Sequence, residues 1–285
     1  MTKHKLPKIE ELFDAGVHFG HQIKRWNPNM EKYIFAQRSG IHIIDLDTTH
    51  EGLKAAADFL FEVASKGDQI VFVGTKRQAR EIIKVEAERA GALFVNERWL
   101  GGTITNFEVI GKNMTKLTDY LKKRESGEFE KYTKKERLLL DREIGKLQSS
   151  VGGIVGFNGK PGAVFVVDSK REKTVVKEAN INGIPVVGLI DTNSDPKMIE
   201  YVIPGNDDAI RSIAAVVKVV ADAVESGYAE YAKRPPEIVV TDEEIEEDAS
   251  ASSAQKEEKT KKKAVKKEGP KKKRGRPKKK VDDKK

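Results

Sequence analysis

Short apolar runs alternate with amphipathic stretches along the first 235 residues. Five runs rich in β-branched residues predict strands at 41–46, 69–73, 92–95, 163–167 and 185–190. Between and after them, apolar residues recur three and four positions apart, which predicts helices over 48–64, 79–91, 171–181 and 210–227. Continuous apolar strands alternating with helices are typical of a parallel sheet with helices on both faces. We therefore predict an α/β fold of the flavodoxin-like or Rossmann-like kind.

The ends of three predicted helices carry capping residues. Thr48 is expected to cap the first helix, because its hydroxyl can accept a hydrogen bond from a free backbone N–H. Gly91 and Gly227 are expected to end the second and the last, since glycine readily takes the left-handed conformation.

The alternation is interrupted by a long polar segment between the strands at 92–95 and 163–167. Each of its two arms places apolar residues at spacings of four, three and four: Ile110, Met114, Leu117 and Leu121, then Leu140, Ile144, Leu147 and Val151. This spacing favours an antiparallel helical hairpin with one apolar seam per arm, as in a coiled coil. We expect it to be inserted at 105–150 within an α/β domain spanning 1–235.

The net charge of +8 is concentrated at one end. Residues 256–285 hold 17 lysine and arginine side chains against five acids, whereas 241–255 hold six acids and no base. All 19 aromatic residues lie between Phe13 and Tyr231. The segment 236–285 has too little apolar surface to offset the entropy of ordering, so we predict a disordered tail, acidic and then basic.

Composition excludes several classes of chemistry. With no cysteine, the chain has no disulfide framework, thiol nucleophile or Cys-ligated zinc. The longest uncharged run, 147–159, has 13 residues, fewer than the roughly 20 needed to cross a bilayer. The first residues lack the apolar run of a secretory signal. We expect a cytoplasmic protein without a membrane partner.

The sequence lacks complete motifs of the enzymes that this fold class contains. The segment 73–78 (VGTKRQ) lacks the glycine spacing of a P-loop, and the glycines at 152–159 lie before a strand rather than after one. No catalytic constellation is evident, so we expect neither an enzyme nor a small-molecule substrate or cofactor. His18 and His21 are a weak alternative as metal ligands, because no cysteine completes their set.

Basic residues beside aromatic ones indicate nucleic-acid binding. Lys24, Arg25 and Trp26 precede a proline, so they can contact phosphates and stack on a base. An ordinary basic loop with a core tryptophan is an equally good interpretation. Further candidates are Lys76, Arg77 and Arg80 after a predicted strand, and Arg98 and Trp99 before the hairpin. Lys122 and Lys123 in the hairpin and Arg274 and Arg276 in the tail complete the set. The tail pair stands in an AT-hook-like core, which leaves open a DNA-architectural protein; a nucleotide-binding α/β enzyme is the other alternative.

Several long segments resemble the bacterial ribosomal small-subunit protein S-two family. They are 16–22 (GVHFGHQ), 24–28 (KRWNP), 40–46 (GIHIIDL), 72–79 (FVGTKRQA), 97–106 (ERWLGGTITN), 191–196 (DTNSDP) and 203–209 (IPGNDDA). The resemblance covers about residues 5–230 and leaves out the charged tail. It implies a sheet-and-helix domain with a protruding helical hairpin, and a structural role in the small subunit. It also implies binding to small-subunit ribosomal RNA and support for attachment of the messenger-binding protein S-one.

Overall fold

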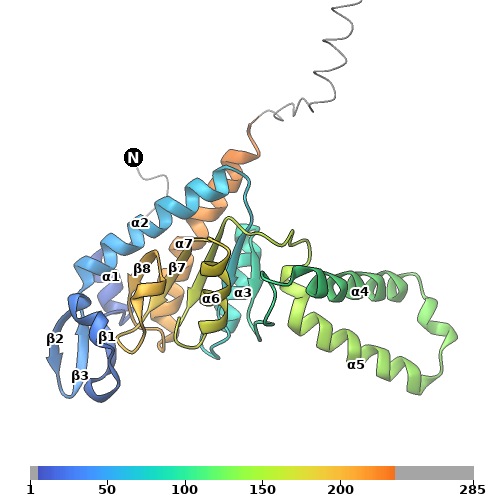
Figure 1. Ribbon diagram of the computed structural model, residues 1–285, viewed down its shortest axis with the longest axis horizontal. Helices are drawn as coiled ribbons and strands as arrows, with labels where there is room; N and C mark the ends of the chain where they lie inside the picture. The colour runs from blue at the N-terminus through green and yellow to red at the C-terminus, as the bar shows by residue number, and fades with distance from the viewer. Residues whose placement is uncertain (1–5, 235–285) are drawn as a thin grey trace, which may run out of the picture. The chain divides into compact units, whose positions relative to one another are not determined.

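The predicted parallel sheet is present in the computed structural model, which describes residues 6–234 (Figure 1). Its five strands are β4 (Ile70–Val73), β5 (Leu93–Val95), β6 (Ala163–Val167), β7 (Val186–Ile190) and β8 (Tyr201–Pro204). They are all parallel and lie in the order β5-β4-β6-β7-β8. Relative to the chain this is the 2-1-3-4-5 order of flavodoxin-like folds, so the predicted fold class is confirmed.

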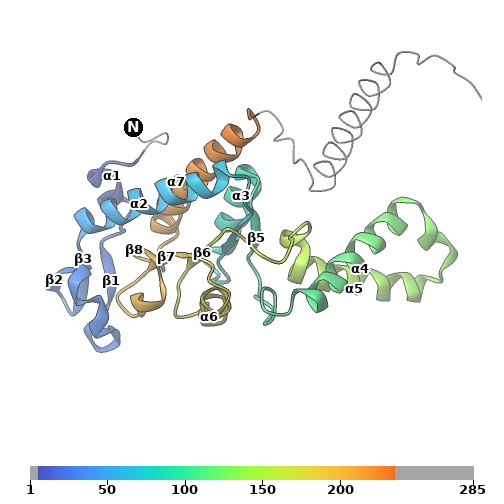
Figure 2. The same cartoon turned by 45° about the horizontal axis from the view of Figure 1, so that its top comes forward.

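Helices cover both faces of the sheet because successive strand side chains point to opposite faces. Phe72 and Phe165 face the layer formed by α2 (Leu46–Ser65), α3 (Arg80–Ala90) and α7 (Ile210–Tyr231). Their neighbours Val71 and Val164 face the other layer, which contains α6 (Lys173–Ile181) and the base of the hairpin. Figure 2 shows the two layers separated by the sheet. The fold therefore has two apolar cores, one on each face.

The inserted segment forms the predicted helical hairpin, with α4 (Phe107–Glu125) and α5 (Lys134–Val151) side by side. Gly127 turns the chain with a φ of 74°. Thr133 and Glu136 then form a capping box that begins α5. The apolar seam is buried at the base of the hairpin by Ile110, Met114, Leu117, Ile144 and Val151. The other predicted seam residues are partly exposed: Leu121, Leu140 and Leu147.

A second, smaller sheet was not anticipated. The strand predicted at 41–46 exists as β3 (Ile41–Ile44), but it pairs antiparallel with β1 (Phe19–Gln22) and β2 (Ile34–Arg38) instead of joining the parallel sheet. The short helix α1 (Ile9–Asp14) precedes it, and the 3-10 helices η1 (Ile23–Arg25) and η2 (Pro28–Tyr33) connect β1 to β2. Strands β1, β2 and β8 were missed because each is short and only partly buried.

Two of the three predicted helix ends differ from expectation. Helix α2 begins at Leu46 with Asp45 as its N-cap, and Thr48 instead donates its hydroxyl to the Asp45 carboxylate at 2.7 Å. Gly91 ends α3 with a φ of 70°, as predicted. Helix α7 continues past Gly227 to Tyr231. A Cβ on Gly227 would lie 2.6 Å from the Ala64 Cβ, so this glycine lets α2 and α7 approach closely.

The predicted disordered tail at 236–285, with Arg274 and Arg276, lies outside the described residues. Among the helices of residues 6–234, none combines the length and the apolar character needed to span a bilayer.

We predict that Gly227→Ala destabilises the protein by about 1–3 kcal/mol, because the added methyl group overpacks the α2–α7 contact. Gly145→Ala is the matched control, since Gly145 is also helical and its added Cβ meets nothing within 4 Å. Replacing that glycine should be neutral or stabilise the protein by up to about 1 kcal/mol. Urea unfolding of both variants gives the two values, and equal values would contradict the packing argument.

Candidate nucleic-acid interface

Charged side chains converge at the edge of the parallel sheet where its strands end. Lys76 follows β4, Asp168 follows β6, and Asp207 and Asp208 follow β8. The Lys76 ammonium lies 2.7 Å from Asp207 Oδ1 and 3.6 Å from Asp168 Oδ2, and it also pairs with Asp208. Although burial opposes its charged form, these carboxylates raise the pKa of Lys76. Lys76 thus forms ion pairs with carboxylates of the protein itself, whereas the sequence suggested that it is free to bind a phosphate.

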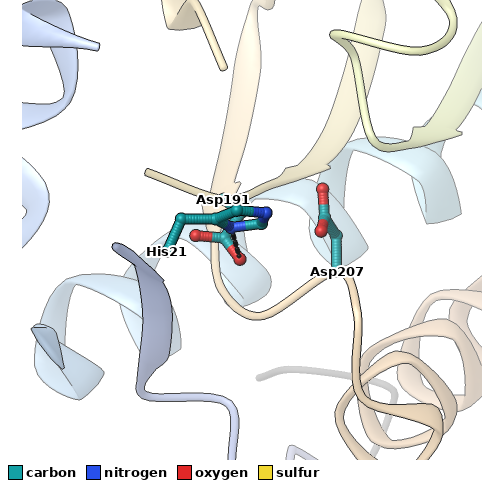
Figure 3. A group of neighbouring side chains, drawn as sticks. All are labelled: His21, Asp191 and Asp207. Atoms are coloured by element: carbon teal, nitrogen blue, oxygen red, sulfur yellow. Dashed lines mark ion pairs between the residues drawn. The ribbon is translucent and has the colours of Figure 1, made fainter. Parts of the chain in front are cut away.

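His21 extends this cluster from the small sheet. Its Nδ1 lies 2.8 Å from Asp191 Oδ2, just beyond β7, and its Nε2 lies 3.3 Å from Asp208 Oδ2. The hydrogen bond with Asp191 raises the pKa of His21. Figure 3 shows His21, Asp191 and Asp207 converging from three separate segments. We call the residues Lys76, His21, Asp168, Asp191, Asp207 and Asp208 the ion-pair cluster.

Asp207 is the most buried carboxylate of this cluster, with an exposed fraction of 0%. Its Oδ2 atom has no hydrogen-bond partner among the described residues. Burial, reinforced by the charges of Asp168 and Asp191, raises the pKa of Asp207 to about 7, although Lys76 opposes the shift. The folded protein therefore favours a proton on Asp207 at acidic pH.

One imidazole nitrogen and two carboxylates also form a set of potential metal ligands. Ligand atoms of His21, Asp191 and Asp207 lie within 4.8 Å of one another, a spacing that can surround a divalent cation. His18 does not join them. Its ring stacks on Phe13 at 4.4 Å and contacts Phe19 at 4.0 Å between centroids, so the sequence-based pair of His18 and His21 is not brought together.

The crevice between β4 and β6 is the position where flavodoxin-like folds bind nucleotides. Here protein side chains fill it. The buried Glu172 carboxylate accepts hydrogen bonds from the Thr75 backbone N–H at 3.1 Å and its hydroxyl at 2.5 Å. Arg171 donates to the same hydroxyl oxygen at 2.9 Å. With Lys76 paired nearby, the loop after β4 is held by internal contacts and does not form an open phosphate cradle.

An open groove of about 580 Å³ lies beside the ion-pair cluster, and Trp26 is one of its lining residues. One wall is formed by residues 25–28 and another by the segment leading from β6 into α6, and Asn193, Asp195 and Met198 complete the lining. Four of its lining side chains are cationic and one is a carboxylate: Arg25, Lys170, Lys173 and Lys177, with Asp195. We call it the Trp26 groove. Lys170, Lys173 and Lys177 were missed, although their position after a strand and on one helix face is visible in the sequence.

The remaining predicted cations are spread over the surface. Lys24, Arg77 and Arg98 are exposed, as are Lys122 and Lys123 in the last turn of α4. Arg80 contacts neighbouring groups of the protein: its Nη1 lies 2.7 Å from Glu97 Oε2, and its Nε donates to the Thr75 carbonyl at 3.1 Å. Of the predicted residues within 6–234, the structure therefore gathers only Arg25 and Trp26 in the Trp26 groove.

Trp99, which the sequence suggested as an RNA contact, is buried and hydrogen-bonded inside the protein. Its side chain is 7% exposed, and its indole Nε1 donates to Glu178 Oε1 at 3.2 Å. The same buried carboxylate accepts the backbone N–H groups of Gly102 at 2.8 Å and Ile104 at 3.1 Å. Glu178 thus orders the loop that leads into α4, a role that its sequence position on a helix did not reveal.

Comparison with known proteins agrees with this architecture. The family model for ribosomal protein S2 matches residues 12–227. A small ribosomal subunit protein uS2 of Roseiflexus sp. (strain RS-1) is 52% identical over 223 residues, covering 78% of this chain and 85% of that protein. The protein of the same name from Hahella chejuensis (strain KCTC 2396) is 49% identical over 231 residues, covering 81% and 91% respectively.

These matches first define a class, that of the ribosomal proteins, which are structural rather than enzymatic. Within that class, the chain belongs to the ribosomal protein S2 family, which confirms the resemblance found in its sequence.

We predict that Glu178→Gln destabilises the protein by about 1–3 kcal/mol, because the amide cannot accept all the N–H groups that the carboxylate holds. Denaturant unfolding monitored by tryptophan fluorescence measures the change. Glu88→Gln, at an exposed position of α3, is the control and should shift the midpoint little. A negligible effect of Glu178→Gln would show that the loop is held by other contacts.

The buried carboxylate Asp207 predicts a specific pH dependence. Its pKa rises from 3.8 to about 7 on folding, so its contribution to stability is present at low pH and is lost as the pH rises through that window. Asp207→Asn keeps the side chain neutral, so the stability of the variant relative to wild type should rise as the pH increases from 4 to 7, on top of a pH-independent loss of the Lys76 ion pair. Urea unfolding across this range gives the difference at each pH.

The exposed neighbour Asp208 provides the matched control. The stability difference between Asp208→Asn and wild type should vary less with pH than that of Asp207→Asn. A constant offset for Asp207→Asn would contradict the proton linkage.

Proposed function

We propose that this protein is a structural component of the small ribosomal subunit that binds small-subunit ribosomal RNA at the cytoplasmic ribosome. The observation that carries the proposal is the Trp26 groove, which four cations and the partly buried Trp26 line together. Phosphate contacts supply affinity for RNA, and aromatic rings stack on unpaired bases. The names of the relatives from Roseiflexus and Hahella, as small ribosomal subunit proteins, support the same role.

The proposed RNA-binding surface differs from the set expected from sequence. It retains Lys24, Arg25, Trp26, Arg77 and Arg98, which reach solvent. It gains the three lysines on the opposite wall of the groove and loses Lys76 and Trp99, whose partners are internal. Arg80 contributes less to RNA binding in this proposal, because it forms an ion pair with Glu97. Lys122 and Lys123 form a separate patch on the hairpin.

Association with neighbouring small-subunit proteins, including attachment of the messenger-binding protein S-one, belongs to the same proposal. Its support is the family resemblance. The nucleotide-enzyme alternative is weakened by the occupied crevice between β4 and β6. The DNA-architectural alternative depends on Arg274 and Arg276, outside the described residues.

Sedimentation through a sucrose gradient tests the ribosomal role. The tagged full-length protein, expressed in its native cell, should migrate with small subunits and remain there after a wash in moderate salt. Recovery only at the top of the gradient would overturn the proposal. Nucleotide turnover by the purified protein would restore the enzyme alternative.

We predict that replacing Lys170, Lys173 and Lys177 together by alanine weakens binding to small-subunit ribosomal RNA. Three lost phosphate contacts should reduce the slope of log affinity against log salt concentration by about 2. Fluorescence anisotropy at several salt concentrations measures that slope.

A matched control removes three exposed lysines from the helices that cover the opposite face of the sheet: Lys54, Lys84 and Lys218. Both triple variants lose the same charge and keep the tail, so a location-specific effect is separated from bulk charge. Equal slopes for the two variants would show that the groove does not contact RNA.

A further inference from the structure

We propose that the Trp26 groove binds an unpaired nucleotide of an RNA strand, with its base against Trp26 and the flanking phosphates on the lysines of the opposite wall. This inference rests on the proposed RNA-binding function and specifies the structure of the RNA that enters the site. A base inside a duplex has both faces covered by its neighbours, so stacking on the indole requires an unpaired base.

Trp26 is held in place before any ligand arrives. The next residue, Asn27, donates its backbone N–H to the Thr192 carbonyl at 2.7 Å, which ties the loop to the segment after β7. The Asn27 side chain then accepts the Asn29 N–H at 2.9 Å and caps η2. Little conformational entropy remains to be lost when a base stacks on a ring fixed in this way.

A buried histidine supports the indole. The centroids of the Trp26 and His42 rings lie 5.2 Å apart, with the planes inclined by 39°. His42 is fully buried, neither ring nitrogen has a hydrogen-bond partner among the described residues, and burial lowers its pKa. It therefore contributes a neutral ring at physiological pH. Trp26 is consequently packed against the protein while it also lines the groove.

The size and lining of the groove suit a nucleotide. Its volume of about 580 Å³ is within the roughly 300–1,000 Å³ of pockets that hold small organic ligands. Val176 and Met198 supply apolar surface, whereas Asn193 and Asp195 place amide and carboxylate groups in the same lining. A flat base can contact the apolar part while its polar edge meets the amide or the carboxylate.

Phosphates have a separate part of the groove. Lys170, Lys173 and Lys177 line one wall, and Arg25 lies on the other, so cations flank the position of the base. Helix α6 begins at Lys173, and its N-cap Glu172 makes no capping hydrogen bond, since that carboxylate accepts from Thr75 instead. The positive end of the α6 helix dipole adds to the attraction for an anion.

The distribution of cations in the groove favours an RNA strand over a free mononucleotide. The four cations are spread over two walls, an arrangement that fits successive phosphates of a strand better than the single phosphate of a monomer. Short single-stranded RNA should therefore bind much more tightly than adenosine or uridine monophosphate.

Tryptophan fluorescence reports on this site directly, because the chain has two tryptophans and Trp99 is buried. The full-length protein is titrated with an eight-nucleotide single-stranded RNA, its duplex form, and each mononucleotide at equal salt. We expect saturable quenching with the single strand and little with the duplex. The same titration of Trp26→Phe identifies the part of the signal that belongs to Trp26.

Affinity for labelled single-stranded RNA is then compared between wild type and Trp26→Ala. Loss of one base–aromatic stack should weaken binding by roughly 5- to 100-fold. Phe35→Ala is the matched control, because Phe35 is 77% exposed on β2 and does not line the groove. If Trp26→Ala fails to fold, the alanine variants of Lys170, Lys173 and Lys177 test the site with the indole intact, and each should weaken the quenching.

Three outcomes would overturn the inference: equal quenching by duplex and single strand, equal affinity for mononucleotide and oligonucleotide, or equal effects of Trp26→Ala and Phe35→Ala. These are distinct from failure of the proposed function. A protein that enters small subunits but shows no Trp26 response keeps its ribosomal role and loses this site. A protein absent from small subunits loses the ribosomal role whatever the groove binds.

Discussion

The ion pair between Lys76 and Asp207 is the contact on which the arrangement of the carboxyl edge depends. Parallel strands end at the same edge of a sheet, so the acids that follow β6, β7 and β8 are forced together, and carboxylates at close range repel each other. Lys76 at 2.7 Å from Asp207 and His21 at 2.8 Å from Asp191 offset this repulsion. Because His21 lies on β1, the same cluster attaches the small antiparallel sheet to the parallel one.

This attachment positions the proposed binding surface. Once β1 is fixed beside the end of β7, the chain beyond it carries Trp26 to the groove wall, and the Asn27–Thr192 hydrogen bond holds it there. The opposite wall belongs to α6, which packs on the parallel sheet. The usual nucleotide crevice of the fold is meanwhile filled by Glu172, Thr75 and Arg171. The fold thus keeps a flavodoxin-like framework, but its open basic surface lies beside the crevice instead of within it.

The sequence-based prediction was correct for those elements whose apolar residues follow a regular period. Strands such as β6 and β7 are buried along their whole length, so they appear as continuous apolar runs. The hairpin was predictable because Ile110, Met114 and Leu117 follow the helical repeat. Strands β1 and β8 have mixed burial and no comparable pattern. Gly227 was misinterpreted as a helix end, since sequence alone does not distinguish a left-handed turn from a close helix–helix contact.

The sequence by itself determined the α/β class, the inserted hairpin, the separation of charge into a basic end, and, through long motifs, the family. Only the tertiary structure decided which polar residues face inward. Lys76 and Asp207 are 131 positions apart, and Trp99 and Glu178 are 79 apart, so no local pattern pairs them. The tertiary structure also brought Arg25 and Lys173 to one groove. The physical reason is that hydrophobic periodicity specifies elements locally, whereas burial, ion pairing and grooves arise where separate elements meet.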